Sequence, residues 1–111
     1  MRFPAIPLKT LDDQLRFAIA NKRLLRLTYE GAPRIVEPHD YGLLNGVRRL
    51  FVFQLEKAGH LDRRMHVWRL LDLPKFEGCL VLEDTFTGTR AVAGQRHHRW
   101  DVLYARVDET D

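Results

Sequence analysis

Arginine side chains close to aromatic residues are the feature of this sequence best suited to chemistry. Arg48 and Arg49 directly follow a predicted hairpin turn, and Arg69 follows Trp68. A guanidinium group grips phosphates and carboxylates with a planar fork, and aromatic rings can stack on bases. The pattern therefore predicts a surface for an anionic ligand, either a nucleotide or single-stranded nucleic acid. The candidate ligand contacts are Arg48, Arg49, Arg69, His39 and Tyr41.

The same residues also have a purely structural interpretation. Aromatic residues at strand spacing usually belong to a core, and arginines beside a turn are usually solvated. Arg69 could form a salt bridge with Glu37 or Asp72 instead of binding a ligand. Under the ligand-binding hypothesis, the three arginines should share one face or rim of the domain.

Residue types that serve metal binding and catalysis lack the required spacing. His97 and His98 are adjacent, and no histidine has Cys or His partners at zinc spacing. Cys79 lies in the apolar run CLVL, where a cysteine behaves as a small buried hydrophobic residue. The chain also lacks GxGxxG and P-loop motifs. We therefore expect no metal site, no cofactor and no enzymatic activity.

Length and composition predict one domain. The chain has 111 residues, of which 45% are hydrophobic, so one core of ordinary size can form. The formal net charge is +3, and the single cysteine excludes an internal disulfide. The first ten residues form no long apolar run, so we expect neither a signal peptide nor a membrane span. The expectation is a cytoplasmic protein without a membrane partner.

The N-terminal part of the sequence predicts one helix. Residues 1–9 contain two prolines and should form an extended lead-in to a single domain at residues 10–111. Thr10 should cap a helix of about three turns, because an acidic residue follows three positions later. Lys22 and Arg23 should lie at the end of this helix, where the helix dipole favours cations.

The hydrophobic period changes to two at Leu24, which predicts strands at 24–30 and 34–38 around a turn at 31–33. Pro38 should mark a sheet edge or a bend.

Asn45-Gly46 predicts a tight turn between strands at 41–44 and 47–56, because both residues tolerate positive φ. The second strand should be central and buried on both faces. A polar loop should follow at 57–64.

Further strands are predicted at 65–73 and 78–84, with a long loop at 85–99. Residues 100–107 fit a helix and a strand equally well. One helix followed by about five short strands predicts a small, strongly bent β-barrel that is plugged by the helix.

Five segments, in this order, resemble the sequence pattern of a WYL domain. They are LRLTYE (25–30), IVEP (35–38), RRLFVFQ (48–54), WRLLDL (68–73) and DTF (84–86). The resemblance covers about residues 11–86. The chain departs from the pattern at its signature triplet, which is Leu50-Phe51-Val52 rather than Trp-Tyr-Leu. It also has Asp72 in place of the second arginine of the later motif.

The resemblance implies a mainly β (α+β) fold, namely an Sm-like, SH3-type barrel of five strands with one N-terminal helix. WYL domains occur in bacterial transcription regulators and are thought to sense a ligand, often a nucleotide or nucleic-acid fragment. The chain is therefore expected to be a stand-alone, WYL-like regulatory module. The alternative is a protein-interaction module whose strand edges accept a regulatory partner or a second copy of the chain.

Overall fold

The computed structural model describes residues 10–61, 67–88 and 98–107. The lead-in predicted at residues 1–9 lies outside this part of the chain. The elements, in chain order, are α1 (Leu11–Ala20), β1 (Arg23–Tyr29), β2 (Ala32–Leu44), β3 (Val47–Lys57), β4 (His60–Leu61), β5 (Val67–Asp72), the 3₁₀ turn η1 (Leu73–Lys75), β6 (Phe76–Thr85) and β7 (Val102–Arg106).

All the strand pairings are antiparallel, and β2 is the spine of the sheet. β3 pairs with one edge of β2. On the other edge, β1 pairs with the N-terminal part of β2 and β7 pairs with its C-terminal part. β6 pairs with the outer edge of β1, and β4 and β5 pair with the outer edge of β3. This confirms a mainly β fold with one helix, but the described residues form seven strands rather than about five.

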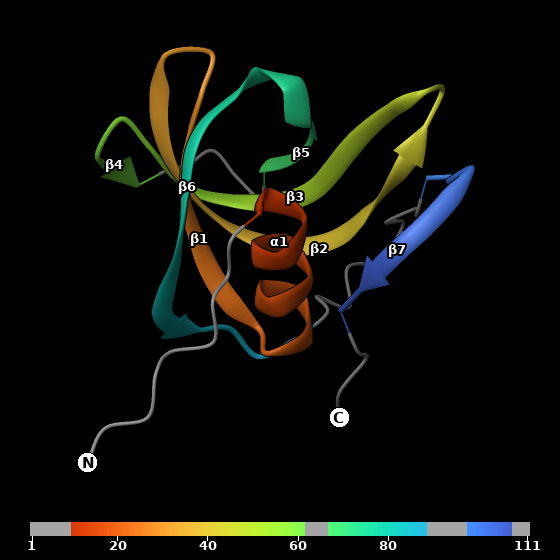
Figure 1. Ribbon diagram of the computed structural model, residues 1–111. Helices are drawn as coiled ribbons and strands as arrows, with labels where there is room; N and C mark the ends of the chain where they lie inside the picture. Colours follow the sequence, from red (N-terminus) through yellow and green to blue (C-terminus); the bar gives the residue numbers. More distant parts are fainter. Residues whose placement is uncertain (1–9, 62–66, 89–97, 108–111) are drawn as a thin grey trace.

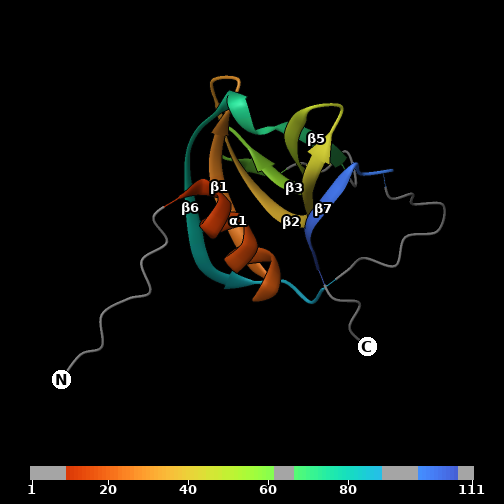
Figure 2. The same ribbon diagram turned by 45° about the vertical axis from the view of Figure 1, so that its right-hand side comes forward.

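The sheet is open at one seam rather than clearly closed into a barrel. η1 carries the chain from β5, a partner of β3, to β6, a partner of β1 (Figure 1). Within the described residues, no ladder of hydrogen bonds joins β5 to β6. Figure 2 shows the β2–β3 hairpin projecting beyond the helix, with β7 alongside it.

α1 begins where the sequence predicts and ends earlier than expected. The backbone N–H of Asp13 donates to Thr10 Oγ1 at 3.0 Å, which confirms Thr10 as the N-cap. The placement of Lys22 and Arg23 at the helix end was wrong. Asn21 caps the helix, Lys22 turns the chain with a φ of 53°, and Arg23 opens β1. The turn is needed because α1 packs back against β1, β2, β6 and β7.

The β2–β3 hairpin confirms the Asn45-Gly46 prediction. The φ angles of these residues are 52° and 78°, as a type I′ turn requires. Glu30 and Gly31 form a similar turn between β1 and β2, so the predicted turn at 31–33 is displaced and its last two residues belong to β2. Part of the loop predicted at 57–64 is also a hairpin, because β4 folds back onto β3.

β2 is one continuous strand where two were predicted. The expected bend near Pro38 is a register shift between Pro38 and Asp40, which leaves His39 as the extra residue of a β-bulge. Residues 100–107, which fitted a helix or a strand, contain the strand β7. β5 and β6 occupy the other two predicted strand regions.

The core lies between α1 and the sheet, and a second aromatic layer lies behind β3. The buried core residues are Leu15, Ala18, Ile19, Leu25, Leu27, Tyr29, Val36, Tyr41, Leu50, Val52, Leu71, Leu73 and Val107. On the other side of β3, the Trp68 ring lies 4.9 Å from the Phe51 ring and 5.1 Å from the Phe53 ring, between centroids. Residues 50–54 of β3 are all buried, as the sequence predicts.

Candidate functional site

Tyr41 and Arg48, two of the predicted contacts, belong to a network that joins α1 to the sheet. Tyr41 is fully buried, and its hydroxyl donates to Asp12 Oδ1 at 2.6 Å. Arg48 Nη1 donates to the same hydroxyl oxygen at 3.2 Å. Burial and the bond to Asp12 raise the pKa of Tyr41 to about 12, and the bond from Tyr41 lowers the pKa of Asp12. Both predicted contacts are therefore engaged within the protein.

Arg49 lies on the opposite side of β3 from Arg48. Its Nε lies 3.1 Å from Asp72 Oδ1, its ladder neighbour on β5. Asp72 occupies the position where the WYL pattern has a second arginine. This ion pair fastens β3 to β5.

His39 is an interior residue, because the bulge at this position turns it into the aromatic layer. It is 1% exposed, and its Nε2 lies 3.2 Å from Glu37 Oε1. Its ring lies 4.9 Å from the Trp68 ring and 5.3 Å from the Phe86 ring. In this arrangement His39 presents almost no surface to a ligand.

Arg69 is exposed and, unlike Arg48, makes no side-chain hydrogen bond to another described residue. Across the described residues, no carboxylate lies within 4.0 Å of its guanidinium, so the alternative bridge to Glu37 or Asp72 is not formed. Arg69 is the ladder neighbour of Val52. It therefore shares a side of β3 with Arg48, but roughly 13 Å further along the strand. The structure does not bring the three predicted arginines together.

A different arginine, Arg34, lies close to Arg69, and the sequence-based selection missed it. Arg34 is only 5% exposed. Its Nη1 donates to Gln54 Oε1 at 3.0 Å, and its Nη2 donates to the Tyr29 carbonyl at 3.3 Å. Its guanidinium also lies over the Tyr29 ring, 5.3 Å from the centroid. Burial, followed by the nearby charge of Arg69, lowers the pKa of Arg34.

One signal in the sequence could have pointed to Arg34. It lies two positions before Val36, on the face of β2 that points into the core. An arginine at such an inward position must find polar partners or a ligand, because burying an unpaired charge is costly.

The two arginines line a hollow of about 320 Å³, which we call the Arg34–Arg69 hollow. Its lining residues are Tyr29, Glu30, Arg34, Trp68, Arg69, Leu70 and Leu71. The hollow lies between β5 and the β1–β2 turn. Figures 1 and 2 show this turn at the same end of the molecule as the connection from β5 to β6 that contains η1. Lys75 of η1 reaches Glu30 of this turn, with 3.5 Å between Nζ and Oε2.

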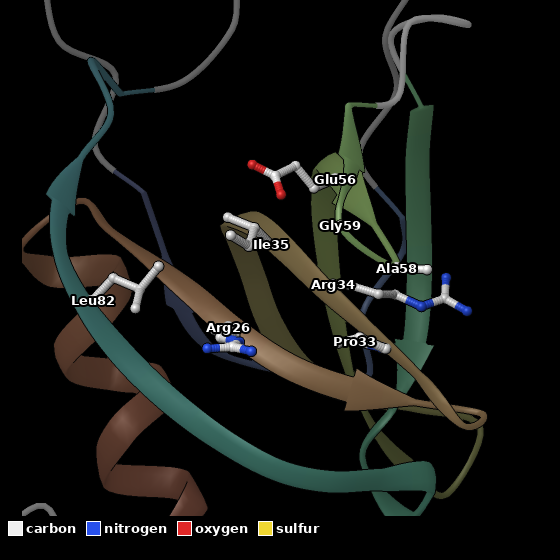
Figure 3. Close-up of a pocket in the computed structure, with 8 residues that line it drawn as sticks. All are labelled: Arg26, Pro33, Arg34, Ile35, Glu56, Ala58, Gly59 and Leu82. Carbon is white, nitrogen blue, oxygen red and sulfur yellow. The ribbon is translucent and has the colours of Figure 1, made fainter.

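A second hollow, of about 430 Å³, lies on the outer face of the sheet (Figure 3). It is lined by Arg26, Pro33, Arg34, Ile35, Glu56, Ala58, Gly59 and Leu82. Arg34 lines both hollows, and Figure 3 shows its guanidinium extending away from Arg26 and Leu82. The outer hollow is mainly apolar, and its charged lining residues are Arg26, Arg34 and Glu56.

Comparisons with protein-family models, curated proteins and solved structures find no match to this chain. The site must therefore be interpreted from its own chemistry.

Other types of site find little support in the part of the chain that is described. No three His, Cys, Asp or Glu side chains there gather in a way that could hold a metal ion. Burial raises the pKa of the Cys79 thiol to about 11, which disfavours the nucleophilic thiolate at neutral pH. α1 is ten residues long, and no described helix could cross a bilayer.

Proposed function

We propose that this domain is a binding module for an anionic ligand of the nucleotide or single-stranded nucleic-acid class, and that the Arg34–Arg69 hollow is its contact site. One observation carries the proposal. Two guanidinium groups share one hollow, and among the described residues neither has a carboxylate within ion-pair distance.

The electrostatics of Arg34 favour an added anion. Its two hydrogen-bond acceptors are neutral oxygens, so two of the five N–H donors of its guanidinium are used without any charge being neutralised. Arg69 adds a second positive charge nearby. Glu30 offsets part of this charge, but it is also engaged by Lys75. An anion between the two arginines would relieve their repulsion and accept hydrogen bonds from both.

The fold and the sequence resemblance support the same proposal. The strand order β5-β3-β2-β1-β6, with a 3₁₀ turn between β5 and β6, is compatible with an Sm-like, SH3-type barrel. Arg69 is the arginine that matches the WYL pattern. We therefore propose a WYL-like regulatory module that senses its ligand by binding, without a catalytic step.

Equilibrium binding at low salt tests this function. We expect the wild type to bind thymidine 5′-monophosphate or a short single-stranded oligonucleotide. Arg69→Ala should weaken this binding by about tenfold or more, because it removes a charged hydrogen-bond donor. Its affinity should also depend less steeply on salt. Arg26→Ala removes an exposed arginine from the outer hollow and is the matched control. Absence of any binding by the wild type would overturn the proposal.

Exposed apolar groups favour a second candidate, a protein-interaction surface. Leu80 on β6 is 57% exposed, and β6 pairs only with β1 among the described strands. The apolar outer hollow lies beside the same strand (Figure 3). An added strand from a second copy of the chain could pair with this edge.

Sedimentation over a range of concentrations tests self-association, which Leu80→Asp should abolish. A wild type that stays monomeric at the highest concentration would exclude this homodimer.

A further inference from the structure

In the part of the chain that the structure describes, the positive charge that lines the Arg34–Arg69 hollow comes from two arginines. The hollow has a volume of about 320 Å³ and is lined by seven residues, among which the cations are Arg34 and Arg69. Next to it, Asp72 is paired with Arg49, and Lys75 is paired with Glu30. The outer hollow shares Arg34 with this one, but its second arginine, Arg26, lies on the other face of the sheet (Figure 3).

This arrangement does not suit the backbone of an extended strand. Proteins that bind single strands along their length combine a positively charged groove with stacking positions for several nucleotides. The described residues that line the hollow provide one pair of cations. Of the cations beside it, Arg49 and Lys75 are paired with carboxylates, and Lys57, the ladder neighbour of Arg34, lies outside the lining. A compact anion with a high charge matches this geometry better than a chain of separate phosphates.

The number of positive charges indicates the type of anion. A phosphate monoester carries about −1.5 to −2 charges at neutral pH and has three strong acceptor oxygens. A phosphodiester within a strand carries one negative charge, which would match only one of the two guanidinium groups. Two arginines can share the terminal oxygens of a monoester, because each guanidinium binds oxygen pairs with a planar fork.

We infer that the Arg34–Arg69 hollow selects a phosphate monoester, either of a free mononucleotide or at the end of a strand, over an internal phosphodiester. This inference rests on the proposed anion-binding function and narrows it. The domain then recognises nucleotides or nucleic-acid ends and not continuous strands.

A pH dependence follows from the chemistry of the ligand. A phosphate monoester loses its second proton near pH 6, so the dianion is a minor species at pH 5 and dominant at pH 7.5. Among the described residues, the charged and titratable groups that line the hollow are Arg34, Arg69, Tyr29 and Glu30, with Lys75 behind Glu30 and Lys57 beside Arg34 on β3. Arginine stays protonated over this range. Binding should therefore strengthen by about tenfold from pH 5 to pH 7.5.

Calorimetric titration with two matched probes tests this inference. The probes are thymidine 5′-monophosphate and its methyl phosphate ester, which keeps a single charge across the pH range. We expect the monoester to bind at least about tenfold more tightly at pH 7.5, with the advantage shrinking at pH 5. An oligonucleotide with a 5′-phosphate should likewise exceed the same oligonucleotide with a 5′-hydroxyl. Arg69→Ala should remove both differences, while Arg26→Ala keeps them.

Different experimental results would contradict the anion-binding function and the selection for phosphate monoesters. If both esters, and both oligonucleotides, bind equally well and lose affinity together in Arg69→Ala, the selection for monoesters is wrong and the anion site stands. If no probe binds to the wild type at low salt, both proposals fall. A pH dependence that is equal for the two esters would also overturn the inference, because it would belong to the protein and not to the phosphate.

Discussion

Two regions of this molecule place arginines beside tyrosines and use them in opposite ways. One is the α1–β2–β7 junction, formed by Asp12, Arg16, Asp40, Tyr41, Arg48, Tyr104 and Arg106. The other is the Arg34–Arg69 hollow. In the junction two of the three arginines pair with a carboxylate, Arg16 with Asp12 at 2.9 Å and Arg106 with Asp40 at 2.9 Å. Arg48 donates at 3.2 Å to the Tyr41 hydroxyl, which itself donates to Asp12. In the hollow, neither arginine has a carboxylate partner among the described residues, and Arg34 donates only to neutral oxygens there.

The difference separates two roles that the sequence alone does not distinguish. A cation with a matched partner holds elements together, and its loss leaves the partner unsatisfied. Arg69 is exposed and has no acidic partner among the described residues, so it contributes less to holding the fold and keeps its capacity for an external anion. Arg34 is buried and also ties β2 to Gln54 and Tyr29 on the neighbouring strands. The junction should therefore govern stability, and the hollow should govern binding through Arg69.

Gly42→Ala should break the junction most severely. A Cβ at this position would meet the Val102 carbonyl and lie 2.7 Å from the Trp100 ring, because β7 packs directly against the Gly42 backbone. We expect a loss of about 3 kcal/mol in the free energy of unfolding, at the upper end for overpacking. Urea denaturation measures it. Gly46→Ala is the control, since a Cβ at Gly46 meets nothing within 4 Å and is strained only by its φ of 78°. Equal losses in the two variants would contradict the packing argument.

Tyr41→Phe should have the next largest effect. The substitution keeps the buried ring and removes the hydroxyl that donates to Asp12 and accepts from Arg48. We expect the free energy of unfolding to fall by about 1.5 kcal/mol. Binding of thymidine 5′-monophosphate should stay unchanged, because the hollow lies elsewhere. A stable variant that has lost binding would reverse the roles of the two regions.

The stability difference between the wild type and Tyr41→Phe should depend on pH in the alkaline range. The pKa of Tyr41 is raised from 10.0 to about 12 in the folded protein, so folding favours the protonated phenol. This contribution is complete below pH 10 and is lost as pH rises through about 12. The stability difference between the wild type and Tyr41→Phe should therefore shrink over this range. A difference that stays constant from pH 9 to pH 12 would exclude this linkage.

The elements that the sequence predicts correctly depend on local chemistry. Thr10 caps α1 through a neighbouring backbone N–H, and Asn45-Gly46 forms a turn through its own φ angles. The continuous apolar run of residues 50–53 in β3 indicates burial on both faces, and the structure has it so. β7 could not be assigned from its own period, because its pairing with β2 joins residues about 60 positions apart.

The site residues depend on contacts that no local pattern contains. The β-bulge at His39 turns that side chain into the interior, although the surrounding sequence suggests an exposed contact. Arg49 meets Asp72 only because the β3–β5 register makes them neighbours. Arg34 and Arg69 come together from two strands that are not paired with each other. Sequence therefore indicates that arginine chemistry is present, and the tertiary register decides which arginines are left without acidic partners.

The smallest changes in stability give the most direct comparison of the two regions. Arg48→Ala removes an exposed donor to the Tyr41 hydroxyl, and we expect a loss of about 0.5 kcal/mol with unchanged nucleotide binding. Arg69→Ala removes an exposed cation that has no ion pair in the described residues, so its free energy of unfolding should change by less than about 0.5 kcal/mol. The loss of this cation also removes the repulsion between Arg69 and Arg34, which offsets part of any destabilisation. Its nucleotide affinity should nevertheless fall by about tenfold or more. Denaturation and binding measured on both variants separate the roles: equal losses of binding would show that net charge, and not the hollow, attracts the anion.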